Sequence, residues 1–154
     1  MPQYCISQVD TVQEKEFVIH KCGCAFPVQF QNRKVNRDLL NKICICAEVV
    51  VAYDSTIKGY AAMYTNDYIK FTAYITLITV HPGHQRKSVG YSLLKQCINI
   101  ATYCGMKTIR LEVKRENYAA INLYEKCGFS VEIEHGTDSL YLTKKIGEVM
   151  TCPN

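Results

Sequence analysis

One continuous stretch, residues 71–103, constrains the fold of this chain most, because it predicts a strand, a short basic loop and a helix in direct succession. Residues 74–80 are β-branched, aromatic or aliphatic and contain no glycine, proline or charge, which is typical of a buried strand. Their period of two predicts that Ile75, Leu77 and Thr79 face one side of a sheet and that the alternate residues face the other. A His-Pro-Gly sequence then ends the strand, since proline lacks a backbone donor.

The loop after this strand is small and basic, and it leads into an amphipathic helix. A helix entered from such a loop directs several unpaired N–H groups and the positive end of its dipole to one point, which attracts phosphate. Ser88 and Gly90 leave the backbone accessible, and Arg86 and Lys87 add positive charge. The dipole alone contributes ~0.3–1 kcal/mol, so tight binding requires several N–H contacts. The apolar residues on one face of the helix are Val89, Leu93, Leu94, Cys97, Ile98, Ala101 and Cys104.

Helical and strand patterns alternate along the rest of the chain. The first helix is expected to begin at Thr11, which forms a capping box with Glu14, and to break within residues 22–27. The second has Asn36 as N-cap and buries the apolar residues Leu39, Leu40, Ile43, Cys44 and Ala47. Strands are expected over residues 4–9, 48–53, 59–65 and 108–114, followed by a hairpin of 130–134 with 140–144.

Length and charge limit the classes of protein to which this chain can belong. Its 154 residues fit one domain that buries roughly two thirds of its unfolded surface. The net charge of +4 is modest and its signs are interspersed, which suits an anionic ligand and predicts no nucleic-acid partner. No apolar stretch approaches the ~18 residues that a membrane span requires, so no membrane association is expected.

Nine cysteines are consistent with free thiols in a reducing cytoplasm, because their number is odd and no secretory signal precedes them. Two Cys-x-Cys pairs have one-residue gaps instead of the two to four usual in structural zinc sites, so no metal is predicted. Several cysteines take the place of apolar residues in the helical patterns, namely Cys44, Cys97, Cys104 and Cys127.

Two motifs carry a resemblance to the GCN5-related N-acetyltransferases (GNAT). The loop sequence Gln85-x-x-Ser88-x-Gly90 resembles the family's phosphate loop, Gln/Arg-x-x-Gly-x-Gly/Ala, with serine at the first glycine. Residues 117–129 resemble the family's Asn-x-x-Ala-x-x-Leu-Tyr-x-x-x-Gly-Phe motif with every signature position filled. Two linked motifs at the right distance are much harder to obtain by chance than one, and the similarity covers most of residues 48–145.

This resemblance implies an α/β (α+β) fold with a mixed, mostly antiparallel sheet of six to seven strands and about four helices. It implies an acetyltransferase domain over residues 1–146. Residues 147–154 show no pattern and are expected to form a flexible tail. The strands over 74–80 and 108–114 are expected to splay apart and to admit the pantetheine arm of acetyl-CoA, whose amides pair with backbone groups as an added strand would. The residues expected to bind this cosubstrate are Ile78, Val80, Gln85, Arg86, Lys87, Ser88, Val89, Gly90, Tyr91, Asn117, Tyr124 and Lys126.

The family also suggests roles in catalysis for two residues. Tyr124 matches the proposed general acid that protonates the leaving thiolate, although it shares a helix face with Ala120 and Cys127 and could be a core tyrosine. Glu112, twelve residues earlier, matches members in which a glutamate accepts the amine proton directly or through water, and it could equally be a solvated carboxylate.

Three functions remain open from the residues alone. The first is acetyl transfer to a primary amine of unidentified structure, in a monomer or a homodimer. The second is a sensor that binds acetyl-CoA without turnover. The third, nucleic-acid association through Arg33, Lys34, Arg37 and Lys42, would require a steep dependence on salt. Phe26, Phe30 and the tyrosines at 60, 64 and 68, with Asp67, either shape the acceptor pocket or belong to the core and its turns.

Overall fold

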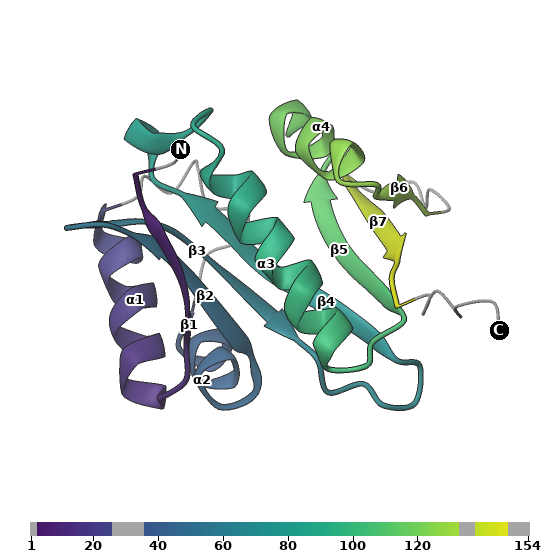
Figure 1. Ribbon diagram of the computed structural model, residues 1–154, viewed down its shortest axis with the longest axis horizontal. Helices are drawn as coiled ribbons and strands as arrows, with labels where there is room; N and C mark the ends of the chain where they lie inside the picture. The colour runs from purple at the N-terminus through teal and green to yellow at the C-terminus, as the bar shows by residue number, and fades with distance from the viewer. Residues whose placement is uncertain (1–2, 26–35, 133–137, 148–154) are drawn as a thin grey trace, which may run out of the picture.

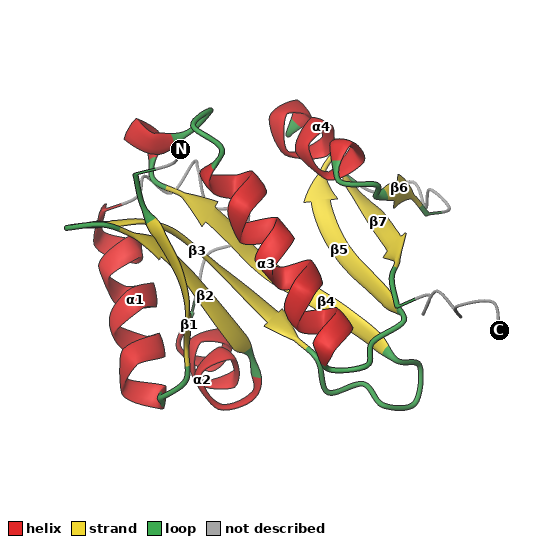
Figure 2. Cartoon of the chain, in the orientation of Figure 1, coloured by secondary structure: helices red, strands yellow, loops and turns green. Residues whose placement is uncertain are grey.

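A seven-stranded sheet with helices on both faces forms the framework of the protein, in a computed structural model that describes residues 3–25, 36–132 and 138–147 (Figure 1, Figure 2). The strands are β1 (Cys5–Val9), β2 (Glu48–Tyr53), β3 (Ile57–Tyr64), β4 (Thr72–Val80), β5 (Thr108–Lys114), β6 (Ser130–Val131) and β7 (Ser139–Lys145). The helices are α1 (Val12–Ala25), α2 (Arg37–Cys46), α3 (Val89–Tyr103) and α4 (Tyr118–Lys126), with a short 3-10 helix η2 (Pro82–His84) before α3.

The sheet has the order β1-β2-β3-β4-β5-β7-β6. Its neighbouring strands pair antiparallel except β4 and β5, which pair parallel because α3 connects them as a crossover. The predicted fold class, a mixed and mostly antiparallel sheet with about four helices, is confirmed. None of the helices within the described ranges is long and apolar enough to cross a bilayer.

Two apolar cores lie on opposite faces of the sheet. One contains the buried face of α3, with Leu93, Leu94 and Cys97, and extends to Leu111 of β5 and Tyr124 of α4. The other packs α1 and α2 against β2, β3 and β4. Figure 1 shows α3 crossing the centre of the sheet and α4 lying where β5 ends and β7 begins. The loop before α3 and the start of α4 therefore lie at the same edge of the sheet.

The helix caps follow the predicted chemistry. The Thr11 hydroxyl accepts a hydrogen bond from the Glu14 N–H at 3.2 Å, and the Glu14 carboxylate accepts one from the Thr11 N–H at 3.4 Å. Asn36 Oδ1 accepts from the Leu39 N–H at 2.9 Å. The predicted break within residues 22–27 is confirmed, because α1 ends at Ala25 and continues through Gly23 before it does so. A glycine inside a helix costs only about 1 kcal/mol, which burial of the apolar face of α1 can offset.

A β-bulge in β4 corrects the predicted face of the central strand. Ile75 pairs with Met63 and Leu77 pairs with Ala62, so Thr76 is the extra residue between two consecutive pairs. Ile75 consequently belongs to the α3 core and Leu77 to the α1–α2 core, although a regular strand would place both on one side. The bulge also turns the side chains of the last residues of β4, including Val80, toward α3.

The start of β3 differs from the sequence prediction, and some residues with predicted roles lie outside the described ranges. β3 begins at Ile57 rather than at residue 59, because Asp54 closes a tight turn by accepting the Thr56 N–H at 2.9 Å. The final hairpin pairs β6 with β7 as predicted. Phe26, Phe30 and residues 148–154 lie outside the described residues.

Gly59 provides a test of the packing between β3 and the end of β4. A Cβ atom on Gly59 would lie 2.6 Å from the Thr79 carbonyl oxygen and 3.2 Å from Val80 Cα, and backbone atoms cannot move away as a flexible side chain can. We expect Gly59→Ala to lower the free energy of unfolding by about 1–3 kcal/mol, measured by urea denaturation. Gly83→Ala is the matched control, since its Cβ would meet only the His81 ring, at 3.3 Å. Equal effects of the two substitutions would contradict this account.

Candidate active site

The first feature of the site is a gap between β4 and β5. The two strands pair only from Thr72 with Thr108 to Ile75 with Leu111. Beyond this point β4 continues to Val80 beside β3, and β5 continues to Lys114 beside β7. Figure 1 shows the two strands diverging toward the end where α3 and α4 begin. Among the described strands none pairs with the facing edges of β4 and β5 past Ile75 and Leu111, so backbone groups there can bind an extended, amide-rich ligand.

The second feature is the conformation of the loop between η2 and α3. Arg86 has φ 60° and Ser88 has φ 66°, whereas Lys87 between them is not left-handed. Each left-handed residue other than glycine costs about 1–2 kcal/mol, and such strain concentrates at functional sites. Left-handed residues that alternate with ordinary ones turn successive N–H groups toward one side and form a concave anion site. Sequence reasoning placed the anion site here without predicting this geometry.

The first turn of α3 continues the same surface. Ser88 is the N-cap and makes no side-chain capping bond, so N–H groups of the first turn are left for a ligand. Val89 is buried, Tyr91 is exposed, and Gly90 lies where a Cβ would be 3.2 Å from Leu123 Cδ2 of α4. The short residue thus brings the start of α3 close to α4. The side chains of Gln85, Arg86 and Lys87 are exposed around the loop. This arrangement fits a diphosphate.

A polar cluster of Lys58, Asp54 and His84 lies at the beginning of the loop. Lys58 Nζ lies 2.8 Å from Asp54 Oδ2 and 3.5 Å from His84 Nε2. Partial burial and then the charge of Lys58 lower the pKa of His84, so its imidazole is neutral at pH 7. His81 Nδ1 accepts the Gly83 N–H at 3.0 Å, which is the role of a turn residue. Sequence reasoning missed Lys58, because His84 becomes its neighbour only when β3 pairs with β4, although Asp54 is close along the chain.

The second motif forms α4, on the far side of the gap. Asn117 is its N-cap and accepts the Ala120 N–H at 3.2 Å. Tyr124 is buried, and its ring centroid lies 5.9 Å from that of Phe129. Burial, above all, raises the pKa of Tyr124 well above its ordinary value, so the phenol remains protonated throughout the physiological range. Lys126 is exposed in the last turn of α4.

Glu112 belongs to a polar network on the opposite face of β5. Alternation along the strand places it away from buried Leu111, and its carboxylate accepts a hydrogen bond from the Tyr141 hydroxyl at 3.5 Å. The Arg110 guanidinium lies 3.9 Å from the Tyr141 ring centroid, and its Nε donates to Glu132 Oε2 at 2.9 Å. The two candidate catalytic residues, Tyr124 and Glu112, therefore lie on opposite sides of the sheet beside the gap.

The predicted aromatic acceptor surface separates into different environments. Tyr60 is buried in the α1–α2 core, whereas Tyr68 is exposed. Lys42 Nζ lies 5.2 Å from the ring centroid of Tyr64. Asp67 is a turn residue, because its carboxylate accepts the N–H groups of Ile69 at 3.2 Å and of Lys70 at 3.0 Å. These residues thus do not form one amine-binding cage.

Seven cysteines are free thiols: Cys5, Cys22, Cys44, Cys46, Cys97, Cys104 and Cys127. Cys22 and Cys97 are buried, whereas Cys5 and Cys46 are exposed. The predicted core positions of Cys44, Cys97, Cys104 and Cys127 are confirmed, since each is buried or packs against a core. Within residues 3–25, 36–132 and 138–147, no group of three histidine, cysteine, aspartate or glutamate side chains is placed to hold a metal ion.

Thiol reactivity should follow this difference in burial. Burial raises the pKa of Cys22 and of Cys97 to about 12, so at pH 8 only on the order of one thiol in ten thousand is the reactive thiolate. An aromatic disulfide reagent should label Cys5 and Cys46 at least about 100-fold faster than Cys22 and Cys97 in the native protein. Peptide mapping after timed labelling measures this ratio. Equal rates before denaturation would contradict the buried assignment.

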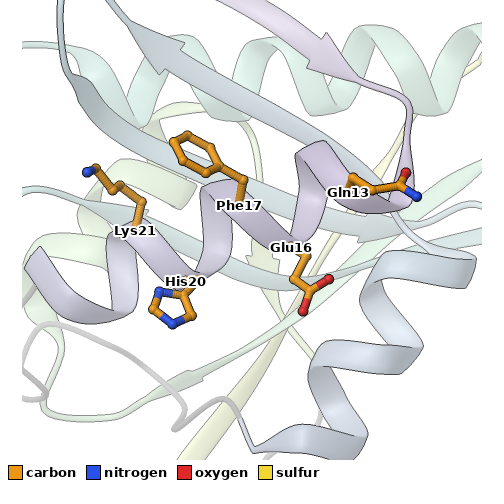
Figure 3. A pocket seen from close by; sticks show the side chains of 5 residues that line it. All are labelled: Gln13, Glu16, Phe17, His20 and Lys21. Carbon is orange, nitrogen blue, oxygen red and sulfur yellow. The ribbon is translucent and has the colours of Figure 1, made fainter.

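Two surface hollows lie elsewhere, along α1. One is lined by Gln13, Glu16, Phe17, His20 and Lys21, whose side chains leave the helix in different directions (Figure 3). Another lies between α1 and the strands β1 and β2. Neither contains a residue of the loop before α3, of the gap or of α4, so neither belongs to the candidate site.

The fold, the gap and the anion-binding loop define an acetyltransferase architecture, and comparison with known families agrees. The model of the Acetyltransferase (GNAT) family matches residues 12–129. The chain belongs to this family, as its two sequence motifs predicted.

Similar proteins of known name cover part of this chain. The [ribosomal protein bS18]-alanine N-acetyltransferase of Escherichia coli (strain K12) is 43% identical over 53 residues, which are 34% of this chain and 36% of the relative. The L-methionine sulfoximine/L-methionine sulfone acetyltransferase of Salmonella typhimurium is 30% identical over 82 residues, 51% of this chain and 47% of the relative. The chain thus matches between about a third and a half of these relatives.

Solved structures share the fold over most of the chain. The ribosomal-protein-S18-alanine N-acetyltransferase from Escherichia coli has a TM-score of 0.73 at 20% identity and covers 99% of both chains. The PaiA N-acetyltransferase from Thermoplasma acidophilum, in complex with coenzyme A, has a TM-score of 0.68 at 18% identity and covers 92% of this chain and 99% of its own. At these identities the similarity establishes the fold alone.

Proposed function

We propose that this chain is an N-acetyltransferase that moves the acetyl group of acetyl-CoA to a primary amine by direct attack in a ternary complex. The observation that carries the proposal is the separation of β4 from β5 beyond Ile75 and Leu111, with a left-handed anion loop at the end of β4. The loop and the first turn of α3 supply N–H groups for a diphosphate, and the gap supplies unpaired backbone for the pantetheine amides.

The residues on the two sides of the gap divide the proton transfers between them. Bound acetyl-CoA supplies an activated acetyl thioester. Glu112, on the open face, accepts the proton of the attacking amine directly or through one water molecule. Tyr124, on the α4 side, gives its proton to the sulfur as the C–S bond breaks, and its raised pKa keeps the phenol protonated until then. A backbone N–H near Val80 can stabilise negative charge on the acetyl oxygen.

The acceptor class rests on the relatives and on the open face of the sheet. The names of similar proteins specify acetyltransferases for an alanine of ribosomal protein bS18, for L-methionine sulfoximine and for streptothricin. We infer an amine acceptor for this chain, approaching from the side of Glu112 and Tyr141. The free thiols fit a reducing compartment such as the cytoplasm.

Two measurements test the proposal in sequence. Calorimetry with CoA should show one site per chain, and release of free thiol from acetyl-CoA should then be followed over a panel of amines: N-terminal peptides, amino acids, polyamines, amino sugars and lysine peptides. We expect at least one amine to raise thiol release well above hydrolysis. Absence of CoA binding would overturn the proposal.

A further inference from the structure

The side chain of Tyr4 reaches from the beginning of the described chain to the loop that precedes α3. Its hydroxyl donates a hydrogen bond to the Ser88 carbonyl oxygen at 3.1 Å, across 84 positions of sequence. It also shares a hydrogen bond of 2.8 Å with the Ser92 hydroxyl in the first turn of α3. Figure 1 shows the beginning of β1 near the start of this helix.

The ring of Tyr4 is held in place as well as its hydroxyl. It is half-buried and packs against the α3 core, just before the edge strand β1. Strand β1 in turn pairs with β2 along its whole length, from Cys5 opposite Tyr53 to Val9 opposite Val49. The side chain of Tyr4 is therefore held in a fixed position beside the loop, unlike the side chains of a disordered terminus.

The group that Tyr4 contacts is the carbonyl of a loop residue with a left-handed backbone. Ser88 is left-handed, with φ 66°, and its carbonyl oxygen also accepts the Ser92 N–H at 3.0 Å. Two donors thus fix the direction of this carbonyl. Because the peptide unit is planar and trans, the N–H of Val89 points opposite to the Ser88 C=O. It therefore points out from the N-terminus of α3, where an anion would lie. Fixing the Ser88 carbonyl therefore also fixes the direction of the Val89 N–H.

We propose that Tyr4 is a positioning residue for the diphosphate of the coenzyme, acting through the Ser88 carbonyl to hold the loop in its binding conformation before the ligand arrives. This inference rests on the proposed function, because it assumes that the loop binds a diphosphate. A loop that is already in the bound shape loses less freedom when the ligand binds. The effect of Tyr4 therefore falls on binding and not on acetyl transfer. No local pattern around residue 4 signals this role, because the contact exists only in the folded chain.

The test compares two thioester substrates that differ in the diphosphate. In Tyr4→Phe the ring is retained and one hydroxyl is lost, so we expect the Kd for CoA and the KM for acetyl-CoA to rise about 3- to 10-fold, the effect of one hydrogen bond, with kcat unchanged. With S-acetyl-pantetheine, which has no diphosphate, kcat/KM should stay within about twofold of wild type. Tyr103→Phe, at an exposed tyrosine in the last turn of α3, is the matched control and should change neither value.

Each outcome decides between the alternatives. Failure of the wild-type protein to bind CoA would overturn the proposed function, and the role of Tyr4 with it. CoA binding by wild type with an unchanged Kd in Tyr4→Phe would overturn the role of Tyr4 alone. Equal losses for acetyl-CoA and S-acetyl-pantetheine would show a general structural effect and would also overturn it. If Tyr4→Phe does not fold, Tyr4→Leu replaces it, because it also removes the hydroxyl that donates to the Ser88 carbonyl and keeps an apolar side chain against the α3 core. The Kd for CoA should again rise, and an unchanged Kd would overturn the role.

Discussion

Replacing Tyr124 with phenylalanine is expected to lower kcat for acetyl transfer by about 100-fold or more, the usual contribution of a positioned proton donor. The substitution keeps the ring that packs against Phe129 and removes only the hydroxyl. We therefore expect the Kd for CoA to change by less than about threefold and the melting temperature to change little. Steady-state kinetics with the best amine, together with calorimetry, measure both quantities.

Two companion variants sharpen this result. Tyr118→Phe alters an exposed tyrosine at the start of the same helix and should leave kcat unchanged. Glu112→Gln should lower kcat/KM most strongly at pH values below the pKa of the amine, because the attacking nitrogen must lose a proton there. Tyr124→Phe should instead lower kcat at all pH values up to about 10, because the raised pKa of Tyr124 keeps the wild-type phenol protonated over that range. A Tyr124→Phe protein with wild-type kcat would favour a core role for the phenol, and absence of turnover in wild type would favour a sensor.

Introducing a negative charge at Ser88 is expected to weaken CoA binding by about 10- to 100-fold. Two unit charges 4 Å apart repel by about 4 kcal/mol near a protein surface, and exposure of Ser88 to solvent reduces this value. The Ser88→Asp variant should keep its fold, because aspartate tolerates the left-handed region better than most residues and is favoured at helix N-termini. Calorimetry with CoA at low salt measures the loss.

Ser88→Asn separates charge from shape in this experiment. Asparagine has nearly the same shape as aspartate and also tolerates the left-handed conformation, so the difference in Kd between the two variants isolates the charge. That difference should shrink at about 0.5 M salt, because screening weakens repulsion between exposed charges. Equal affinities of the two variants at low salt would show that the diphosphate does not bind over this loop.

Local chemistry allowed much of the fold to be predicted. Thr11 with Glu14, Asn36 and Asn117 cap helices as their side-chain chemistry predicts, because a capping bond joins residues only a few positions apart. The end of α1, at Ala25, was predicted only to within the segment 22–27. Its glycine weakens the helix locally, and packing of Val18 and Cys22 against the sheet carries the helix past it.

The features of the candidate site likewise divide into those that local sequence predicts and those that depend on the folded structure. The sequence motif located the anion loop, but the left-handed conformation of Arg86 and Ser88 is a property of the folded loop, since both residue types usually adopt negative φ. The β-bulge at Thr76 could not be predicted from the sequence either, because a run with a regular period of two does not show where an extra residue is inserted.

The sequence by itself determined the order of elements, the position of the loop before α3 and the family, because periodicity, capping and motif spacing act between residues close along the chain. Only the tertiary structure decided where β4 leaves β5, which face each half of β4 presents, and that Tyr4 contacts Ser88. These features depend on strand register and on contacts between distant segments, whose energies arise only when the sheet has formed.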